Sequence, residues 1–128
     1  MNRWVLIADD EANVLEAMQE FFASQGWSVE IAATYEAAEA LVTHRFYDLV
    51  LTDLSFDGNR DRQGLALARH VRAANPSTVV VVVTANAGTA IFKEAEHSGV
   101  GRVLSKPVAL ASLLRVASSL VDSRGANP

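Results

Sequence analysis

Five side chains with chemically useful groups each follow or close a short apolar run, although they lie far apart along the 128-residue chain. The acids Asp9 and Asp10 follow one run, Asp53 follows another, Thr84 closes a third, and Lys106 follows the last. In a parallel α/β sheet the strand ends gather at one edge, and ligands bind outside that edge. Three carboxylates in one place repel one another unless a cation or a proton intervenes. The pattern therefore indicates a site for magnesium and a phosphoryl group.

The residue types suit this chemistry. Mg2+ takes six oxygen ligands and usually keeps several waters, so carboxylates from Asp9, Asp10 and Asp53, a main-chain carbonyl just beyond Asp53 and waters would complete its shell. Asp53 can also act as a nucleophile, because carboxylates form acyl phosphates. Lys106 would supply a positive charge and Thr84 a hydroxyl donor, in a transfer that depends mostly on positioning and electrostatics.

Each residue has a simpler interpretation when it is taken alone. An acidic pair can cap a helix, Asp53 can be a turn residue, Thr84 an ordinary strand residue and Lys106 a solvated lysine. Their combination at successive strand ends favours a common site.

The rest of the sequence predicts five strands and five helices in strict alternation. Strands are expected at 4–8, 27–32, 48–53, 79–84 and 102–105, and helices from 13 to Gly26 and at 35–42, 64–74, 87–98 and 110–121. Thr34 is the expected N-cap of the second helix. Such alternation implies a parallel sheet with right-handed crossovers and helices on both faces.

Composition limits the alternatives. Half of the residues are apolar, which suits one compact domain, and no cysteine is present, which excludes disulfides and thiolate metal sites and favours the cytoplasm. No segment is long enough for membrane insertion, and the N-terminal apolar stretch is too short for a signal peptide. The net charge of -4 argues against direct nucleic-acid binding. We expect a folded domain at 1–122 and a flexible tail at 123–128.

Together the motifs resemble those of the receiver domain of two-component response regulators. The matching segments are Asp9-Asp10, Leu49-Val50-Leu51-Thr52-Asp53, Val82-Val83-Thr84-Ala85 and Lys106-Pro107, and the likeness extends from about Arg3 to Val121. The resemblance implies a (βα)5, doubly wound, five-stranded parallel sheet of the flavodoxin-like type.

The resemblance also implies roles. Asp53 corresponds to the phosphoacceptor, Asp9 and Asp10 to the metal-binding acids, with Asp10 favoured as the direct ligand, and the main-chain carbonyl of Ser55 to a further Mg2+ ligand. In this view Asp53 contributes to the metal shell as well.

Two further roles come from the same likeness. Thr84 corresponds to the switch hydroxyl and Lys106 to the family's lysine, with a cis peptide expected between Lys106 and Pro107. The small side chain of Ala85 fits a place that a phosphoryl group must reach.

The function implied is that of a single-domain response regulator. It would accept a phosphoryl group on Asp53, with Mg2+, from a sensor histidine kinase or a histidine phosphotransfer protein. It would hydrolyse its own acyl phosphate slowly and would not otherwise be an enzyme. Phosphorylation would shift an equilibrium between two conformations and so signal to a separate downstream effector protein.

Two alternatives belong to other classes. A receiver-like scaffold would bind partners without phosphorylation, and an Asp53→Asn variant with full activity would favour it. A small phosphohydrolase with an aspartyl nucleophile would need a second acid two residues later, where Ser55 stands; turnover of a small phosphate ester would favour this alternative.

Two departures from the family pattern concern regulation. Phe56 and Asp57 replace the usual methionine and proline, and the loop at 56–63 is longer than usual. We interpret it as a tolerated insertion; the alternative is a partner-specific or site-covering loop with Arg60 or Arg62 near the phosphoryl group. Val103 stands where receivers often carry an aromatic residue that turns inward. We therefore expect the signal to pass through Thr84 and the segment at 85–88.

Overall fold

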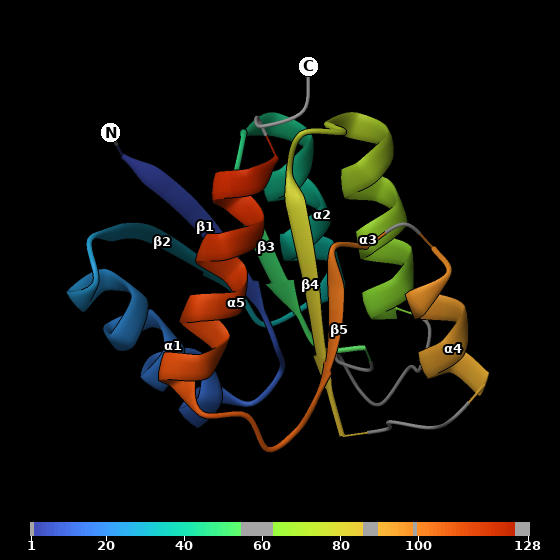
Figure 1. The fold of residues 1–128 in the computed structure, drawn as a ribbon. Coiled ribbons are helices and arrows are strands. Elements are labelled where there is room, and N and C mark those ends of the chain that lie inside the picture. Colours follow the sequence, from blue (N-terminus) through green and yellow to red (C-terminus); the bar gives the residue numbers. More distant parts are fainter. Residues whose placement is uncertain (1, 55–62, 86–89, 99, 125–128) are drawn as a thin grey trace.

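One parallel sheet with helices on both faces forms the molecule (Figure 1). The computed structural model describes residues 2–54, 63–85, 90–98 and 100–124. The strands are β1 (Arg3–Ala8), β2 (Trp27–Ala32), β3 (Leu49–Thr52), β4 (Val79–Thr84) and β5 (Arg102–Ser105), in the order β2-β1-β3-β4-β5. The helices are α1 (Ala12–Ser24), α2 (Tyr35–His44), α3 (Gln63–Ala74), α4 (Ala90–Glu96) and α5 (Leu110–Ser123). The predicted doubly wound (βα)5 fold is confirmed.

Alternate residues of the central strands build two cores, one on each face of the sheet. Val5 and Ile7 of β1 pack into the core that contains α1 and α5, whereas Leu6 and Ala8 pack into the core that contains residues of α2, α3 and α4. Figure 1 shows the same division of the helices. Because side chains alternate along a strand, a sheet covered on both faces requires the nearly continuous apolar runs that the sequence contains.

Local signals end several elements where the sequence places them. Gly26 adopts a φ of 92° just after α1, a conformation that an L side chain rarely takes. The hydroxyl of Thr34 accepts a hydrogen bond from the N–H of Ala37 at 3.2 Å, which confirms the expected N-cap of α2. The start expected for the fourth helix at 87 lies outside the described residues, and α4 ends at Glu96, before the predicted 98.

Strand β3 is shorter than predicted at both ends, because Asp48 and Asp53 flank it instead of belonging to it. The carboxylate of Asp48 accepts the N–H of Trp4 at 2.8 Å, so a side chain replaces a main-chain partner there. Arg124 also donates to the Asp48 carboxylate, at 2.5 Å, and to its carbonyl, at 3.0 Å. A buried carboxylate needs such partners.

The last helix runs further than predicted, since Ser123 belongs to α5 and Arg124 contacts Asp48. Residues 125–128 of the predicted tail lie outside the described residues, and for them the tail stays a prediction. Among the helices that the structure describes, none combines the length and apolarity needed to cross a membrane.

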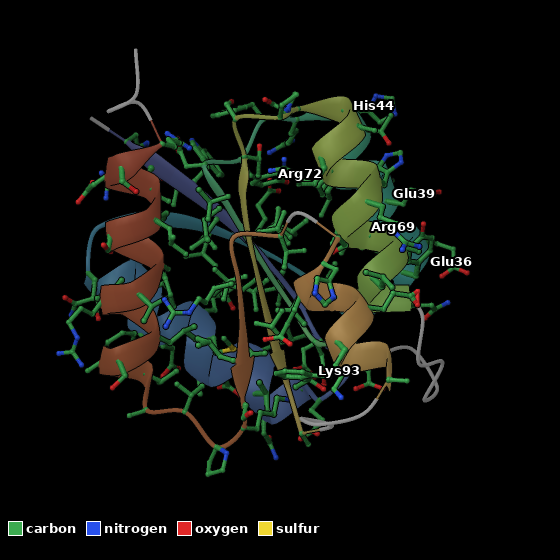
Figure 2. The ribbon with its side chains drawn as sticks, turned by 45° about the vertical axis from the view of Figure 1, so that its right-hand side comes forward. Glu36, Glu39, His44, Arg69, Arg72 and Lys93 are labelled. Atoms are coloured by element: carbon green, nitrogen blue, oxygen red, sulfur yellow. The ribbon has the colours of Figure 1, made fainter. Side chains whose placement is uncertain are left out.

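The outer side of α2, α3 and α4 carries side chains of both charges (Figure 2). Glu36 and Glu39 come from α2 and Arg69 from α3, and Arg69 forms an ion pair with Glu94 of α4 at 3.6 Å. Exposed pairs of this kind contribute little to stability.

Helix α3 begins against the main chain that follows β3. The N–H of Gly64 donates to the carbonyl of Leu54 at 2.9 Å, and a Cβ added to Gly64 would lie 2.0 Å from the carbonyl oxygen of Asp53 and 2.6 Å from the Cα of Leu54. Only glycine permits this approach.

We predict that Gly64→Ala destabilises the fold, because main chain must move to accommodate the methyl group. The expected loss in the free energy of unfolding is about 3 kcal/mol, although alanine by itself favours a helix by about 1 kcal/mol. Urea denaturation measures it.

Gly101→Ala is the matched control, since the nearest atom to its added Cβ would lie at 3.1 Å. We expect this variant to lose much less stability. Equal losses in the two variants would contradict the role assigned to Gly64.

Candidate functional site

The carboxyl ends of the central strands bring the predicted site residues together at one edge of the sheet. The register pairs Ala8 with Thr52, and the N–H of Asp53 donates to the carbonyl of Ala8 at 3.1 Å. On the other side, the N–H of Lys106 donates to the carbonyl of Thr84 at 2.8 Å. The main chain therefore ties the end of β3 to that of β1, and the end of β5 to that of β4.

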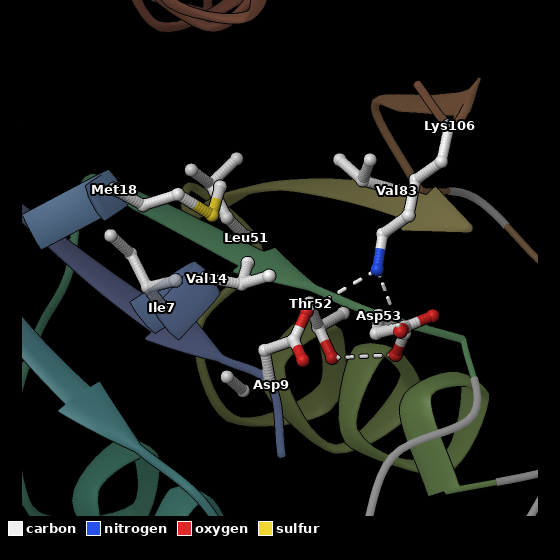
Figure 3. A pocket seen from close by; sticks show the side chains of 10 residues that line it. Ile7, Asp9, Val14, Met18, Leu51, Thr52, Asp53, Val83 and Lys106 are labelled. Carbon is white, nitrogen blue, oxygen red and sulfur yellow. Dashed lines mark hydrogen bonds and ion pairs between the residues drawn. The ribbon is translucent and has the colours of Figure 1, made fainter. Parts of the chain in front are cut away.

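The side chain of Lys106 joins two of the acids (Figure 3). Its ammonium donates to Asp53 Oδ2 at 3.0 Å and to Asp9 Oδ2 at 3.4 Å. Partial burial lowers the pKa of Lys106, but the hydrogen bonds and charges of Asp53 and Asp9 outweigh that effect, so its pKa is raised above the ordinary value. The ammonium is thus held in its charged form between two carboxylates.

Asp9 and Asp10 have different environments although they are adjacent. Asp9 is buried, and its Oδ1 accepts the N–H of Glu11 at 3.0 Å while its Oδ2 contacts Lys106. Asp10 is exposed. Both oxygens of Asp9 are therefore engaged with protein groups, which supports the preference for Asp10 as a direct ligand of a cation.

The donor set fits Mg2+. Among the residues that the structure describes, no three acidic or histidine side chains form a ready cluster for a metal. Mg2+, however, is typically held by one or two carboxylates and several waters, and Asp9 and Asp53 already share one positive charge. Asp10 and Asp53 would hold the ion, with Asp9 close by. Ser55, the fourth predicted ligand, lies outside the described residues.

Beneath these charges lies a small, mainly apolar cavity of about 20 Å3 (Figure 3). Its lining combines the polar groups of the site with apolar side chains from α1 and the sheet: Ile7, Ala8, Asp9, Val14, Met18, Leu51, Thr52, Asp53, Val83 and Lys106. Electrostatic interactions are stronger beside such a surface than in bulk water.

A larger cleft of about 580 Å3 is also lined by Lys106. Its lining includes Val14 and Met18 of α1, Val108 of the segment after β5 and Leu110 at the start of α5. The cleft is lined mainly by apolar side chains.

The residues expected to transmit a signal have clear positions. Thr84 is fully buried, Ala85 after it is exposed, and the peptide between Lys106 and Pro107 is cis, as the resemblance implied. Val103 is half-buried against the core on the α2, α3 and α4 side. Residues 86–88 and most of the loop at 56–63 lie outside the described residues, so the hypotheses on both segments stay predictions.

Sequence reasoning missed one side chain at this site. The hydroxyl of Thr52 donates to the carbonyl oxygen of Asp53 at 2.9 Å, and Thr52 is 2% exposed. A threonine that ends an apolar strand gives no signal of such a contact, because the same residue type is common in any strand.

The comparisons with known proteins agree with this geometry. Residues 5–118 match the family model described as response regulator receiver domain. A cyclic di-GMP phosphodiesterase of Thermotoga maritima is 35% identical over 88% of this chain and 29% of its own length. The transcriptional regulatory protein DltR of Streptococcus agalactiae is 29% identical over 86% of this chain and 48% of its own length. The chain thus spans half or less of these curated relatives.

Solved structures show the same arrangement. A CheY-like receiver domain protein of Methanospirillum hungatei superposes with a TM-score of 0.89 at 25% identity and covers 97% of both chains. The receiver domain of the Francisella response regulator 1452 gives 0.83 at 25% identity, over 94% of this chain and 98% of its own.

We predict that Lys106→Met lowers the free energy of unfolding at neutral pH by about 1 to 2 kcal/mol, because it leaves two neighbouring carboxylates without their cation. A raised pKa means that the folded state binds the proton more tightly. The stabilisation of the folded state by Lys106 is therefore complete below its ordinary pKa of about 10.4. It is lost as the pH rises through the higher pKa that Lys106 has in the folded state. Urea denaturation across this range measures the difference between parent and variant.

Lys93→Met, which removes an exposed lysine on α4, is the control and should cost little. Burial and neighbouring glutamates also raise the pKa values of Tyr35 and Tyr47, so every chain loses stability at high pH. The tyrosine effect is common to the parent and Lys106→Met, so the difference between their free energies of unfolding reports on Lys106 alone. A gap between parent and Lys106→Met that persists at high pH would contradict this account.

We also predict that Mg2+ raises the melting temperature of the parent, since a ligand that binds only the folded state stabilises it by mass action. Asp10→Asn should reduce this gain, whereas Asp122→Asn, on exposed α5 surface, should retain it. Differential scanning calorimetry with and without Mg2+ measures the gain. Equal gains in the two variants would exclude Asp10 as a ligand.

Proposed function

The chain belongs to the response regulator receiver domain family, and from that premise we propose that it takes a phosphoryl group onto Asp53 and signals through a change in conformation. The observation that carries this proposal is the ammonium of Lys106, which contacts both Asp53 and Asp9 at the carboxyl edge of the sheet. A site with this arrangement can orient a nucleophilic carboxylate beside a fixed positive charge.

The proposed reaction has two steps. A carboxylate oxygen of Asp53 attacks the phosphorus of a phosphohistidine; a P–O bond forms, the P–N bond breaks, and the imidazole leaves with the bonding electron pair. Later a water attacks the same phosphorus, the bond to Asp53 breaks, and inorganic phosphate and the free carboxylate result. The domain thus acts on its own side chain, as a signalling domain.

Three side chains serve these steps in the proposal. During transfer, negative charge moves from the carboxylate of Asp53 onto the phosphoryl oxygens. The ammonium of Lys106, which contacts Asp53, would stabilise that charge. Asp10, with Asp53, would hold Mg2+, which would offset the negative charge of the transferring group when it is bound. Thr84 would provide the hydroxyl that responds to the phosphoryl group, and its main chain already contacts Lys106.

The phosphodonor in this proposal is a sensor histidine kinase or a histidine phosphotransfer protein. The apolar cleft between α1 and the segment after β5 lies next to Lys106 and supports docking of a protein surface there. The phosphorylated form would then be recognised by a downstream effector protein. We place the reaction in the cytoplasm, which the lack of cysteine supports.

The activities of the longer relatives are not part of this proposal. The Thermotoga maritima protein is named a phosphodiesterase, but the matching part is only 29% of its length. The alternative of a small phosphohydrolase has no supporting observation, since a serine occupies the position where a second acid is needed.

We predict that the purified chain, incubated with acetyl phosphate and Mg2+, gains one phosphoryl group on Asp53, because this carboxylate faces the fixed cation of the site. Peptide mass mapping after borohydride trapping identifies the residue. Asp53→Asn should gain none.

Asp122→Asn is the matched control, because it removes a carboxylate far from the site, on α5, and should be phosphorylated like the parent. A parent without phosphate on Asp53, or an Asp53→Asn variant with full signalling in cells, would refute the proposed function.

A further inference from the structure

We propose that Thr52 is a positioning residue for phosphoryl transfer, which acts through the main chain of Asp53. This inference rests on the proposed function of Asp53. Thr52 is the last residue of β3, and its hydroxyl donates to the carbonyl oxygen of Asp53 at 2.9 Å (Figure 3). The side chain does not need to touch the phosphoryl group, because its effect is on the orientation of the nucleophile.

The main chain around Asp53 is held from several sides. The N–H of Asp53 donates to the carbonyl of Ala8 at 3.1 Å, and the carbonyl of Leu54 accepts the N–H of Gly64 at 2.9 Å. The backbone of Gly64 lies so close to the Asp53 carbonyl that an added Cβ would be 2.0 Å from its oxygen. The hydroxyl of Thr52 adds a directed bond to that same oxygen.

This bond matters because the carboxylate of Asp53 is separated from its main chain by one methylene group. A small rotation of the peptide therefore moves Oδ2 relative to the ammonium of Lys106, which lies 3.0 Å away. Transfer rates depend steeply on such alignment, and a displacement of about 1 Å can cost about a hundredfold. Thr52 thus holds the nucleophile in line for attack.

A purely structural explanation has to be set against this one, because any buried hydroxyl needs a hydrogen-bond partner. Thr78 provides the comparison within the same molecule. It is 4% exposed, and its hydroxyl donates to the carbonyl of Tyr47 at 2.7 Å, directly before β4 and so at the opposite edge of the sheet. Thr78 satisfies the same local requirement, but its acceptor is not the carbonyl of the phosphoacceptor.

The test measures phosphorylation of the full chain by acetyl phosphate and Mg2+ in four variants: Thr52→Val, Thr52→Ala, Thr52→Ser and Thr78→Val. Valine keeps the shape of threonine and removes the hydroxyl, alanine removes it without risk of overpacking, and serine retains it. Circular dichroism gives the folded fraction of each chain, and every rate is divided by that fraction. Initial rates across acetyl phosphate concentrations separate the maximal rate from the half-saturating concentration.

We expect Thr52→Val and Thr52→Ala to lower the maximal rate by about fivefold to tenfold, the effect of losing one directed hydrogen bond, with an unchanged half-saturating concentration. Thr52→Ser should stay within about twofold of the parent, since it keeps the donor. Thr78→Val should melt at a lower temperature and keep the parental rate per folded molecule.

Three results would overturn the inference while leaving the proposed function intact: parental rates in Thr52→Val and Thr52→Ala, an equal slowing in Thr52→Ser, or an equal slowing in Thr78→Val. A parent that takes no phosphate on Asp53 would overturn both proposals together. The parent is measured in the same series, so the two failures are distinguishable.

Discussion

The contact on which the rest of the site depends is the sharing of one ammonium between two carboxylates. The ammonium of Lys106 lies between Asp53 and Asp9 and donates a hydrogen bond to each (Figure 3). Two acids so close to the same cation would repel each other without it, so the charged form of Lys106 stabilises the folded state. The same local excess of negative charge would favour the binding of a divalent cation in the proposed function. The stability of the fold and the proposed function thus depend on the same charges.

The sheet can support this concentration of charge because both of its faces are covered. The core with α1 and α5 and the core with α2, α3 and α4 bury the apolar side chains of the central strands. Burial of that area provides the main favourable free energy of folding. Several of the buried polar side chains, among them Asp9, Thr52 and Thr84, lie at or just after the carboxyl ends of the strands. The same edge carries the carbonyl of Thr84, bonded to the N–H of Lys106, so the site and the element that is expected to switch share a main-chain contact.

The positions around Asp53 show how precisely the supporting residues are arranged. Thr52 and Gly64 do not belong to the reacting groups, yet one donates to the Asp53 carbonyl and the other packs against it. If Asp53 is the nucleophile, as proposed, these contacts limit its motion before any ligand arrives, and such preorganisation reduces the cost of alignment during reaction. The site therefore extends beyond the acids and the lysine to the peptide groups that carry them.

The sequence by itself was sufficient for the fold class and the five strands, and it proposed which residues share the site. Apolar runs and β-branched residues such as those of Val79–Thr84 predict buried strands through local periodicity, and the rule that parallel strands end at one edge then brings Asp9, Asp53, Thr84 and Lys106 together. Only the tertiary structure decided which atoms meet. The sharing of Lys106, the engagement of both Asp9 oxygens and the bond from Thr52 to Asp53 depend on side-chain orientation. The exclusion of Asp48 from β3 and the extension of α5 to Ser123 accompany the contact between Asp48 and Arg124, 76 positions apart. No local pattern reports a contact at that separation, because its free energy arises only after the chain has folded.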